Sequence, residues 1–122
     1  MKPGVLVVDD EEEICDYIRD ILQDEGYAVK QAFCGEDVPA ALAANEFNIA
    51  FVDLKLSTTL SGLDVITLLR QESPGIKIVA ITGYVDTHLR QATENLGVNF
   101  FLEKPFKPNE VLQAVQSICR SD

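Results

Sequence analysis

The sequence predicts an α/β fold in which five parallel strands alternate with five helices. Short apolar runs recur along the chain and are nearly continuous, as in strands that are buried on both faces of a parallel sheet. Segments with apolar residues three and four positions apart separate these runs, which is the spacing of amphipathic helices. This alternation favours a three-layer, doubly wound (βα)5 domain with right-handed crossovers.

The five predicted strands are short, and most of them run into polar residues. The β-branched residue valine dominates the first strand. The second strand alternates polar and apolar residues more than the others, which is typical of an edge strand. The expected ranges are 4–9, 27–33, 48–53, 76–81 and 98–102.

The five predicted helices follow the strands in turn. Three glutamates in the first turn of the first helix suit the positive end of its dipole. Gly26 and Gly97 are expected to end the first and fourth helices. Pro39 is tolerated in a first turn but not deeper, so we expect the second helix to begin late, with Asp37 as its N-cap. The expected ranges are 11–25, 37–45, 63–72, 86–95 and 108–119.

Composition sets bounds on function. The 122 residues fit one domain, and 47% hydrophobic residues can form a core. A formal net charge of −10 argues against direct binding to nucleic acid or to anionic membranes, which needs a basic surface. Three cysteines without a C-x-x-C pair and a single histidine predict reduced thiols and no Cys/His metal set. The sequence has no secretion signal or membrane-length apolar run, so a cytoplasmic location is expected.

Polar residues at the ends of the predicted strands suggest one common site. Asp9 and Asp10 follow the first strand, Asp53 ends the third, Thr82 follows the fourth and Lys104 lies just after the fifth. In an open α/β sheet, ligands bind outside the carboxyl ends of the strands. Two carboxylates about 4 Å apart repel by roughly 4 kcal/mol at an effective dielectric of 20. A hard divalent cation such as Mg²⁺, or Mn²⁺ in its place, would remove that cost.

Four motifs carry a family resemblance: VVDD at 7–10, VDL with Asp53, ITG with Thr82, and EKPF with Lys104 and Pro105. Together and in this order they resemble the receiver domain of two-component response regulators, of the chemotaxis-regulator type. The resemblance covers nearly the whole chain, so 1–122 is expected to be a single receiver domain. It implies a flavodoxin-like sheet with strand order 2-1-3-4-5.

The resemblance also implies a function. The chain would be a phosphoacceptor signalling domain of a phosphorelay, with Asp53 phosphorylated by a histidine kinase or a phosphotransfer protein. It would catalyse only its own phosphorylation and dephosphorylation and would not be a conventional turnover enzyme. Asp10 and Asp53 would ligate Mg²⁺ directly, Asp9 would act largely through water, and the backbone carbonyl of Lys55 would supply a further ligand.

Other residues receive roles from the same resemblance. Thr82 and Lys104 would bind oxygens of the phosphoryl group, and the peptide bond before Pro105 would be cis. Thr82 and Phe101 would form the switch that reshapes the surface of the fourth helix, fifth strand and fifth helix for a downstream protein or output domain. The resemblance leaves open a homodimer through that surface. Gly83 would leave room for the phosphoryl group.

Tyr84 and Lys55 would line the path of the attacking water.

The segment after Asp53 departs from the family pattern. Ser57 stands where the family usually has a proline, and Gly62 comes one residue late, so the 55–61 loop is one residue longer. We expect this difference to affect partner choice and reaction rates.

Simpler interpretations stay open for single residues. Asp9 and Asp10 could form a helix N-cap with an acidic first turn, and Phe101 could be a core residue. Alternative functions are a degenerate receiver that acts only as a protein-interaction module, an aspartyl-phosphate hydrolase and a flavin-binding domain. The hydrolase family needs a second acid where Lys55 stands. The flavin-binding class needs a phosphate loop where residues 9–13 are acidic.

Overall fold

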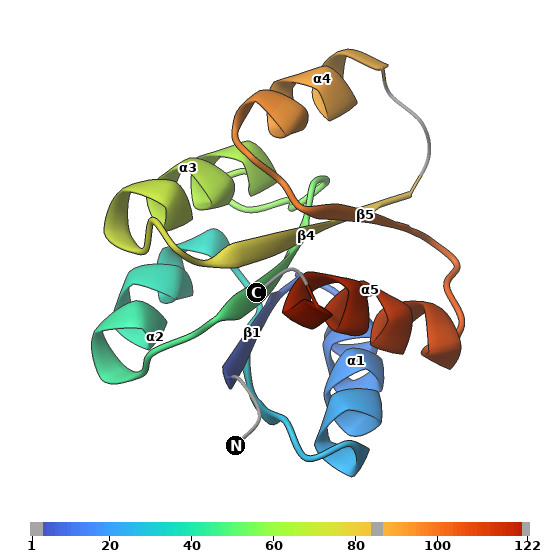
Figure 1. Cartoon of the computed structure of the whole chain (residues 1–122). Helices are drawn as coiled ribbons and strands as arrows, with labels where there is room; N and C mark the ends of the chain where they lie inside the picture. The colour runs from blue at the N-terminus through green and yellow to red at the C-terminus, as the bar shows by residue number, and fades with distance from the viewer. Residues whose placement is uncertain (1–3, 84–86, 121–122) are drawn as a thin grey trace.

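The computed structural model describes residues 4–83 and 87–120 as one parallel five-stranded sheet with helices on both faces (Figure 1). The strand order is β2-β1-β3-β4-β5, which confirms the predicted flavodoxin-like topology. The strands are β1 (Gly4–Val8), β2 (Ala28–Ala32), β3 (Ile49–Asp53), β4 (Lys77–Thr82) and β5 (Phe100–Glu103). β2 lies at an edge of the sheet, as its alternating pattern predicts.

The helices are α1 (Glu12–Asp24), α2 (Val38–Ala44), α3 (Gly62–Glu72), α4 (Thr87–Asn95) and α5 (Pro108–Arg120), with a 3₁₀ turn η1 (Gly35–Asp37) before α2. Figure 1 shows α1 and α5 side by side on one face of the sheet, and α2 and α3 on the other. Among the residues that the structure describes, no helix is both long and apolar enough to cross a membrane.

The core has two halves because successive residues of a strand point to opposite faces. In β1, Val5 and Val7 pack beneath α1 and α5, whereas Leu6 and Val8 pack beneath α2 and α3. All five residues of β3 are buried, since this strand is central and covered on both faces. The continuous apolar runs of the sequence therefore mark strands that are enclosed from both sides.

Two helix ends were predicted from glycine. Gly26, after α1, has a φ of 92°, and Gly97, after α4, has a φ of 79°. These are left-handed conformations that other residues adopt only with strain, so glycine ends both helices as predicted.

The start of α2 differs in detail from its prediction. Pro39 does lie in the first turn, and Asp37 takes the N-cap position. However, the Asp37 side chain makes no capping hydrogen bond, and its backbone is helical because the η1 turn leads directly into α2. A glycine at position 35 makes this turn possible: a Cβ there would lie 2.6 Å from the Cβ of Leu60.

The strand β5 begins at Phe100, two residues later than predicted. Asn99 nevertheless pairs with β4, since its backbone N–H donates to the carbonyl of Ile78 at 2.9 Å. Its side-chain Oδ1 accepts from the Ile78 N–H, also at 2.9 Å. A side-chain oxygen thus replaces one backbone acceptor between β4 and β5, which apolar periodicity could not reveal.

Candidate functional site

Three carboxylates meet at the carboxyl ends of β1 and β3, which are neighbours in the sheet. Asp9 and Asp10 directly follow β1, and Asp53 is the last residue of β3. One oxygen from each of the three lies within 4.8 Å of the others. Asp9 and Asp53 are buried, while Asp10 is half-buried. The structure therefore brings together the three acids that the strand ends suggested.

Local hydrogen bonds fix the direction of two of these carboxylates. Oδ1 of Asp9 accepts from the backbone N–H of Glu11 at 2.9 Å, in the turn that leads into α1. Oδ1 of Asp53 accepts from the backbone N–H of Lys55 at 3.0 Å. In both residues one oxygen is held by the following turn, and Oδ2 faces the site.

Lys104 supplies the positive charge of the site. Its Nζ lies 3.3 Å from Oδ2 of Asp9, 3.5 Å from Oδ2 of Asp53 and 2.6 Å from Oε2 of Glu11. Burial opposes the ammonium charge, but the hydrogen bond to Glu11 and the charges of both aspartates outweigh it and raise the pKa of Lys104. The ammonium therefore stays charged. The peptide bond between Lys104 and Pro105 is cis, the geometry that the resemblance implies.

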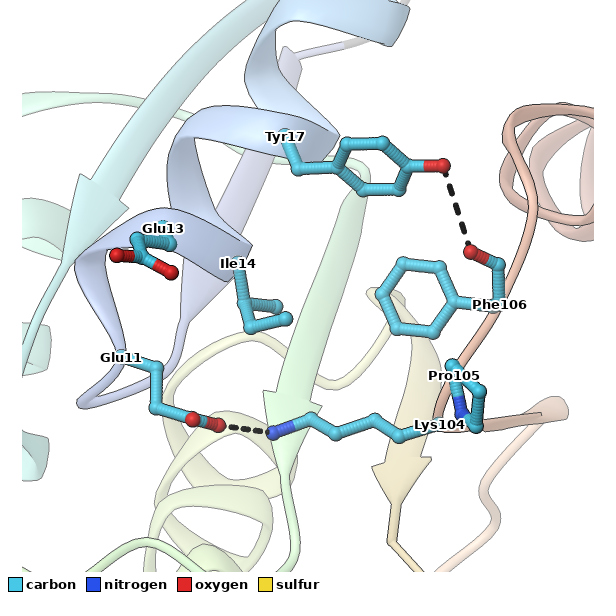
Figure 2. Close-up of a pocket in the computed structure, with 7 residues that line it drawn as sticks. All are labelled: Glu11, Glu13, Ile14, Tyr17, Lys104, Pro105 and Phe106. Carbon is cyan, nitrogen blue, oxygen red and sulfur yellow. Dashed lines mark hydrogen bonds and ion pairs between the residues drawn. The ribbon is translucent and has the colours of Figure 1, made fainter.

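Glu11 is the residue of this cluster that the sequence reasoning missed. It forms the shortest contact of Lys104, and the two side chains point toward each other across the site (Figure 2). The sequence pattern places Glu11 only in the acidic first turn of a helix. Its position directly after Asp9 and Asp10, at the same strand end, was the available signal.

Asp9 has an unusual environment for a carboxyl group. Burial raises the pKa of Asp9 to about 7, and the charge of Asp53 adds to this, against the opposing effects of the Glu11 N–H and of Lys104. Its Oδ2 atom is buried and has no hydrogen-bond partner within the described residues. A buried oxygen that contacts an ammonium group at 3.3 Å, beside two further carboxylates, fits an oxygen-ligand site for a hard divalent cation.

Three other predicted residues, Thr82, Gly83 and Phe101, lie on or directly after β4 and β5. Thr82 ends β4, is half-buried, and accepts the Lys104 N–H with its backbone carbonyl at 2.7 Å. Gly83 is exposed, and a Cβ there would meet nothing within 4 Å. Tyr84 lies outside the described residues. Phe101 is half-buried against the core beneath α2 and α3, and the Arg90 guanidinium of α4 lies over its ring, 4.2 Å from the centroid.

The loop after β3 ends at Gly62, the first residue of α3. A Cβ at Gly62 would lie 2.4 Å from the carbonyl oxygen of Asp53 and 2.7 Å from the Cα of Leu54. Glycine at this position therefore lets the start of α3 pack directly on the end of β3. Within the loop, Lys55 is exposed, and the backbone N–H of Ser57 donates to Oδ2 of Asp10 at 3.1 Å.

A pocket of about 550 Å³ opens beside Lys104, between the first half of α1 and the segment after β5 (Figure 2). Tyr17 and Phe106 form its wall: their ring centroids are 5.9 Å apart, and the Tyr17 hydroxyl donates to the Phe106 carbonyl at 3.4 Å. The pocket residues are Glu11, Glu13, Ile14, Tyr17, Lys104, Pro105 and Phe106. Lys104 therefore belongs both to this surface pocket and to the carboxylate cluster.

Comparison with known proteins identifies the class of this fold and site. The family model of the response regulator receiver domain matches residues 5–116. The chain belongs to this family, and it is a receiver domain of a two-component response regulator.

Curated relatives agree with this assignment. The nitrogen assimilation regulatory protein NtrX of Azorhizobium caulinodans is 32% identical over 113 residues, which are 92% of this chain and 25% of that protein. The photosynthetic apparatus regulatory protein RegA of Rhodovulum sulfidophilum is 32% identical over 115 residues, which are 94% of this chain and 62% of that protein. The chain thus spans only part of the length of these relatives.

Solved structures agree as well. A CheY-like response regulator receiver domain protein from Methanospirillum hungatei JF-1 superposes with a TM-score of 0.92 at 27% identity, covering 99% of this chain and 96% of that one. The receiver domain of NtrX from Brucella abortus gives a TM-score of 0.90 at 28% identity, covering 97% and 99%.

Proposed function

We propose that this receiver domain accepts a phosphoryl group on Asp53 from a histidine kinase or a phosphotransfer protein, with Mg²⁺ or Mn²⁺ bound. One observation carries the proposal: Asp9, Asp10 and Asp53 converge within 4.8 Å at a strand-end crevice. The ammonium of Lys104 faces two of these acids at 3.3 and 3.5 Å.

The three acids of the cluster would bind the cation in different ways. Asp10 and Asp53 would ligate it directly, with the backbone carbonyl of Lys55, and Asp9 would act largely through water. When bound, the cation would neutralise negative charge on the incoming phosphoryl group. The Oδ2 atom of Asp9 supports this arrangement, because it is buried and accepts no hydrogen bond within the described residues, and its ion pair with Lys104 is 3.3 Å long.

Asp53 would act as the nucleophile. A carboxylate oxygen forms a bond to phosphorus, the phosphorus–nitrogen bond to the donor imidazole breaks, and its electron pair returns to that ring. Lys104 would pair with one phosphoryl oxygen, and its raised pKa keeps the ammonium charged for this role. The Thr82 hydroxyl would donate to another oxygen. Gly83, which borders open space, would leave room for the group.

Phosphorylation would then bias a switch. The phosphoryl group adds a charge of about −1.5 to −2. Thr82 would move toward it, and Phe101 would rotate into the space that becomes free. The surface of α4, β5 and α5 would change as a result and would be read by a downstream protein or output domain. Such a switch redistributes two existing states and creates no new one.

Intact-mass measurement after incubation with Mg²⁺ and acetyl phosphate tests this function. We expect a single phosphoryl adduct on the parent protein and on Asp24→Asn, a control at the exposed end of α1. The Asp53→Asn variant should carry none. Beryllofluoride, a stable phosphoryl mimic, covers the case of rapid hydrolysis. If the parent neither forms an adduct nor binds beryllofluoride, the domain acts as a phosphorylation-independent interaction module.

A further inference from the structure

The 55–61 loop contacts the proposed metal site through its backbone. The N–H of Ser57 donates to Oδ2 of Asp10 at 3.1 Å, across 47 positions of the chain. A hydrogen bond to an ionised carboxylate is charge-assisted and stronger than a neutral one. The loop therefore holds one oxygen of a carboxylate that lies between β1 and α1.

A second set of contacts fixes the loop on the η1 turn. The Thr58 hydroxyl accepts from the backbone N–H of Gly35 at 3.2 Å and donates to the carbonyl of Leu60 at 2.6 Å. Oε1 of Glu36 accepts from the N–H of Leu60 at 2.8 Å. This last hydrogen bond is the main cause of the lowered pKa of Glu36, so the carboxylate stays ionised as an acceptor.

Packing supports these hydrogen bonds. Leu60 lies directly on Gly35, where a Cβ would have no room. Leu56 is buried in the core beneath α2 and α3. Gly62 packs on the backbone of Asp53. The packing of Leu56 before Ser57, and of Leu60 and Gly62 after it, gives the Ser57 amide a defined position relative to Asp10.

We propose that Ser57 is a positioning residue for metal binding. Its N–H holds Oδ2 of Asp10, so that the other oxygen of Asp10 is presented to the cation, and the docking of the loop on η1 sets this N–H in place. The inference rests on the proposed function, in which Asp10 is a ligand. Carboxylates that ligate metals are themselves oriented by hydrogen bonds, and loss of such partners typically costs about 10- to 100-fold in affinity.

The identity of residue 57 gives a direct test. Proline has no N–H and cannot make this bond, whereas alanine keeps the N–H and loses only the side chain. We expect the dissociation constant for Mg²⁺, measured by calorimetry, to rise about tenfold in Ser57→Pro and to stay within about twofold of the parent in Ser57→Ala. Circular dichroism and melting in EDTA show whether each variant is folded. An unchanged or lower constant in a folded Ser57→Pro variant overturns the inference.

A second pair of variants tests the loop from its other end. Glu36→Gln keeps a side-chain oxygen for the Leu60 N–H, and Glu36→Ala removes it. We expect the Mg²⁺ dissociation constant to rise about threefold in Glu36→Ala only, since Glu36 acts through the loop and not on Asp10. If Ser57→Pro does not fold, this pair decides, and equal constants in the two variants overturn the inference.

Two further measurements separate this inference from the proposed function. Coupling is reciprocal, so Mg²⁺ should slow hydrogen exchange of the Ser57 amide in the parent, an effect that a purely structural role would not produce. Asp10→Ala should abolish most Mg²⁺ binding. Parent-like affinity in Asp10→Ala would contradict the metal site itself. Weak binding in Asp10→Ala with parent-like binding in Ser57→Pro contradicts only the positioning role.

Discussion

At the scale of single residues, Asp9 should make the stability of the metal-free protein sensitive to pH. Its pKa is raised from 3.8 to about 7, mainly by burial. The folded state therefore keeps a proton that the unfolded chain has already lost between these two values. The contribution of Asp9 to the free energy of unfolding is greatest below pH 4 and falls as the pH rises through 7.

Replacing Asp9 with asparagine should remove this dependence. In EDTA, the free energy of unfolding of the parent should fall between pH 5 and pH 8. Measured relative to Asp9→Asn, which lacks this titrating group, the fall should be on the order of 2 kcal/mol. Urea denaturation at each pH measures it. A difference between the two proteins that stays constant with pH would contradict the raised pKa.

Gly62 is a second residue whose identity the structure demands. A Cβ there would overlap the carbonyl oxygen of Asp53 at 2.4 Å. Gly62→Ala should therefore lower the free energy of unfolding by about 3 kcal/mol or more, because backbone on both sides must move. Gly75→Ala is the matched control, since nothing lies within 4 Å of a Cβ at Gly75. It should change stability by less than about 1 kcal/mol in the same urea titration.

At the scale of elements, Arg70 ties α3 to the turn before β4 and to the turn between α4 and β5. Its guanidinium donates to the carbonyls of Leu96, Pro74, Ile76 and Gly97, at 2.9, 3.3, 2.6 and 2.6 Å. A planar group with five N–H donors can serve several carbonyls at once. These hydrogen bonds satisfy carbonyls of the turns that connect α3 to β4 and α4 to β5.

Arg70→Ala should be strongly destabilising, because several carbonyls lose their donor together. We expect the free energy of unfolding to fall by about 2–4 kcal/mol, and Arg70→Lys should recover little of it. Arg19→Ala is the control, since the ion pairs of Arg19 with Asp16 and Asp20 lie at the surface. It should cost less than about 1 kcal/mol. Equal losses in Arg70→Ala and Arg19→Ala would contradict this role.

The elements themselves could be predicted well from the sequence. Buried parallel strands and amphipathic helices have recognisable apolar patterns, and Gly26 and Gly97 mark the ends of two helices. The η1 turn and the late start of β5 could not be predicted. The η1 turn depends on the packing of Leu60 over Gly35. The late start of β5 depends on the hydrogen bond from the Ile78 N–H to the side chain of Asn99. Both arise from contacts between segments that are distant in sequence.

At the scale of the whole molecule, Mg²⁺ should stabilise the fold, because the acidic cluster exists only when β1 and β3 are paired. At a concentration 100 times the dissociation constant, the gain should be about 3 kcal/mol, or roughly 10 °C in melting temperature. Asp10→Asn should reduce this gain. NaCl at matched ionic strength controls for screening of the net charge of −10. A melting temperature that does not change across a millimolar Mg²⁺ titration would contradict the metal site.

The arrangement of the site could be predicted to the extent that strand ends define it. Asp9, Asp10 and Asp53 converge because parallel strands deliver their carboxyl ends to one edge. The contact of Lys104 with Glu11, and that of Ser57 with Asp10, were not predicted. They depend on the reach of long side chains and on the path of a loop. Neither of these leaves a periodic pattern in the sequence. The catalytic and switching roles stay predictions.

The packing of Gly62 on the backbone of Asp53 makes these two residues fixed ends of one span. Substitutions between these two ends can then change the contacts of the loop while both ends keep their packing. The contact of Ser57 with Asp10 can therefore be altered separately from the position of the Asp53 carboxylate.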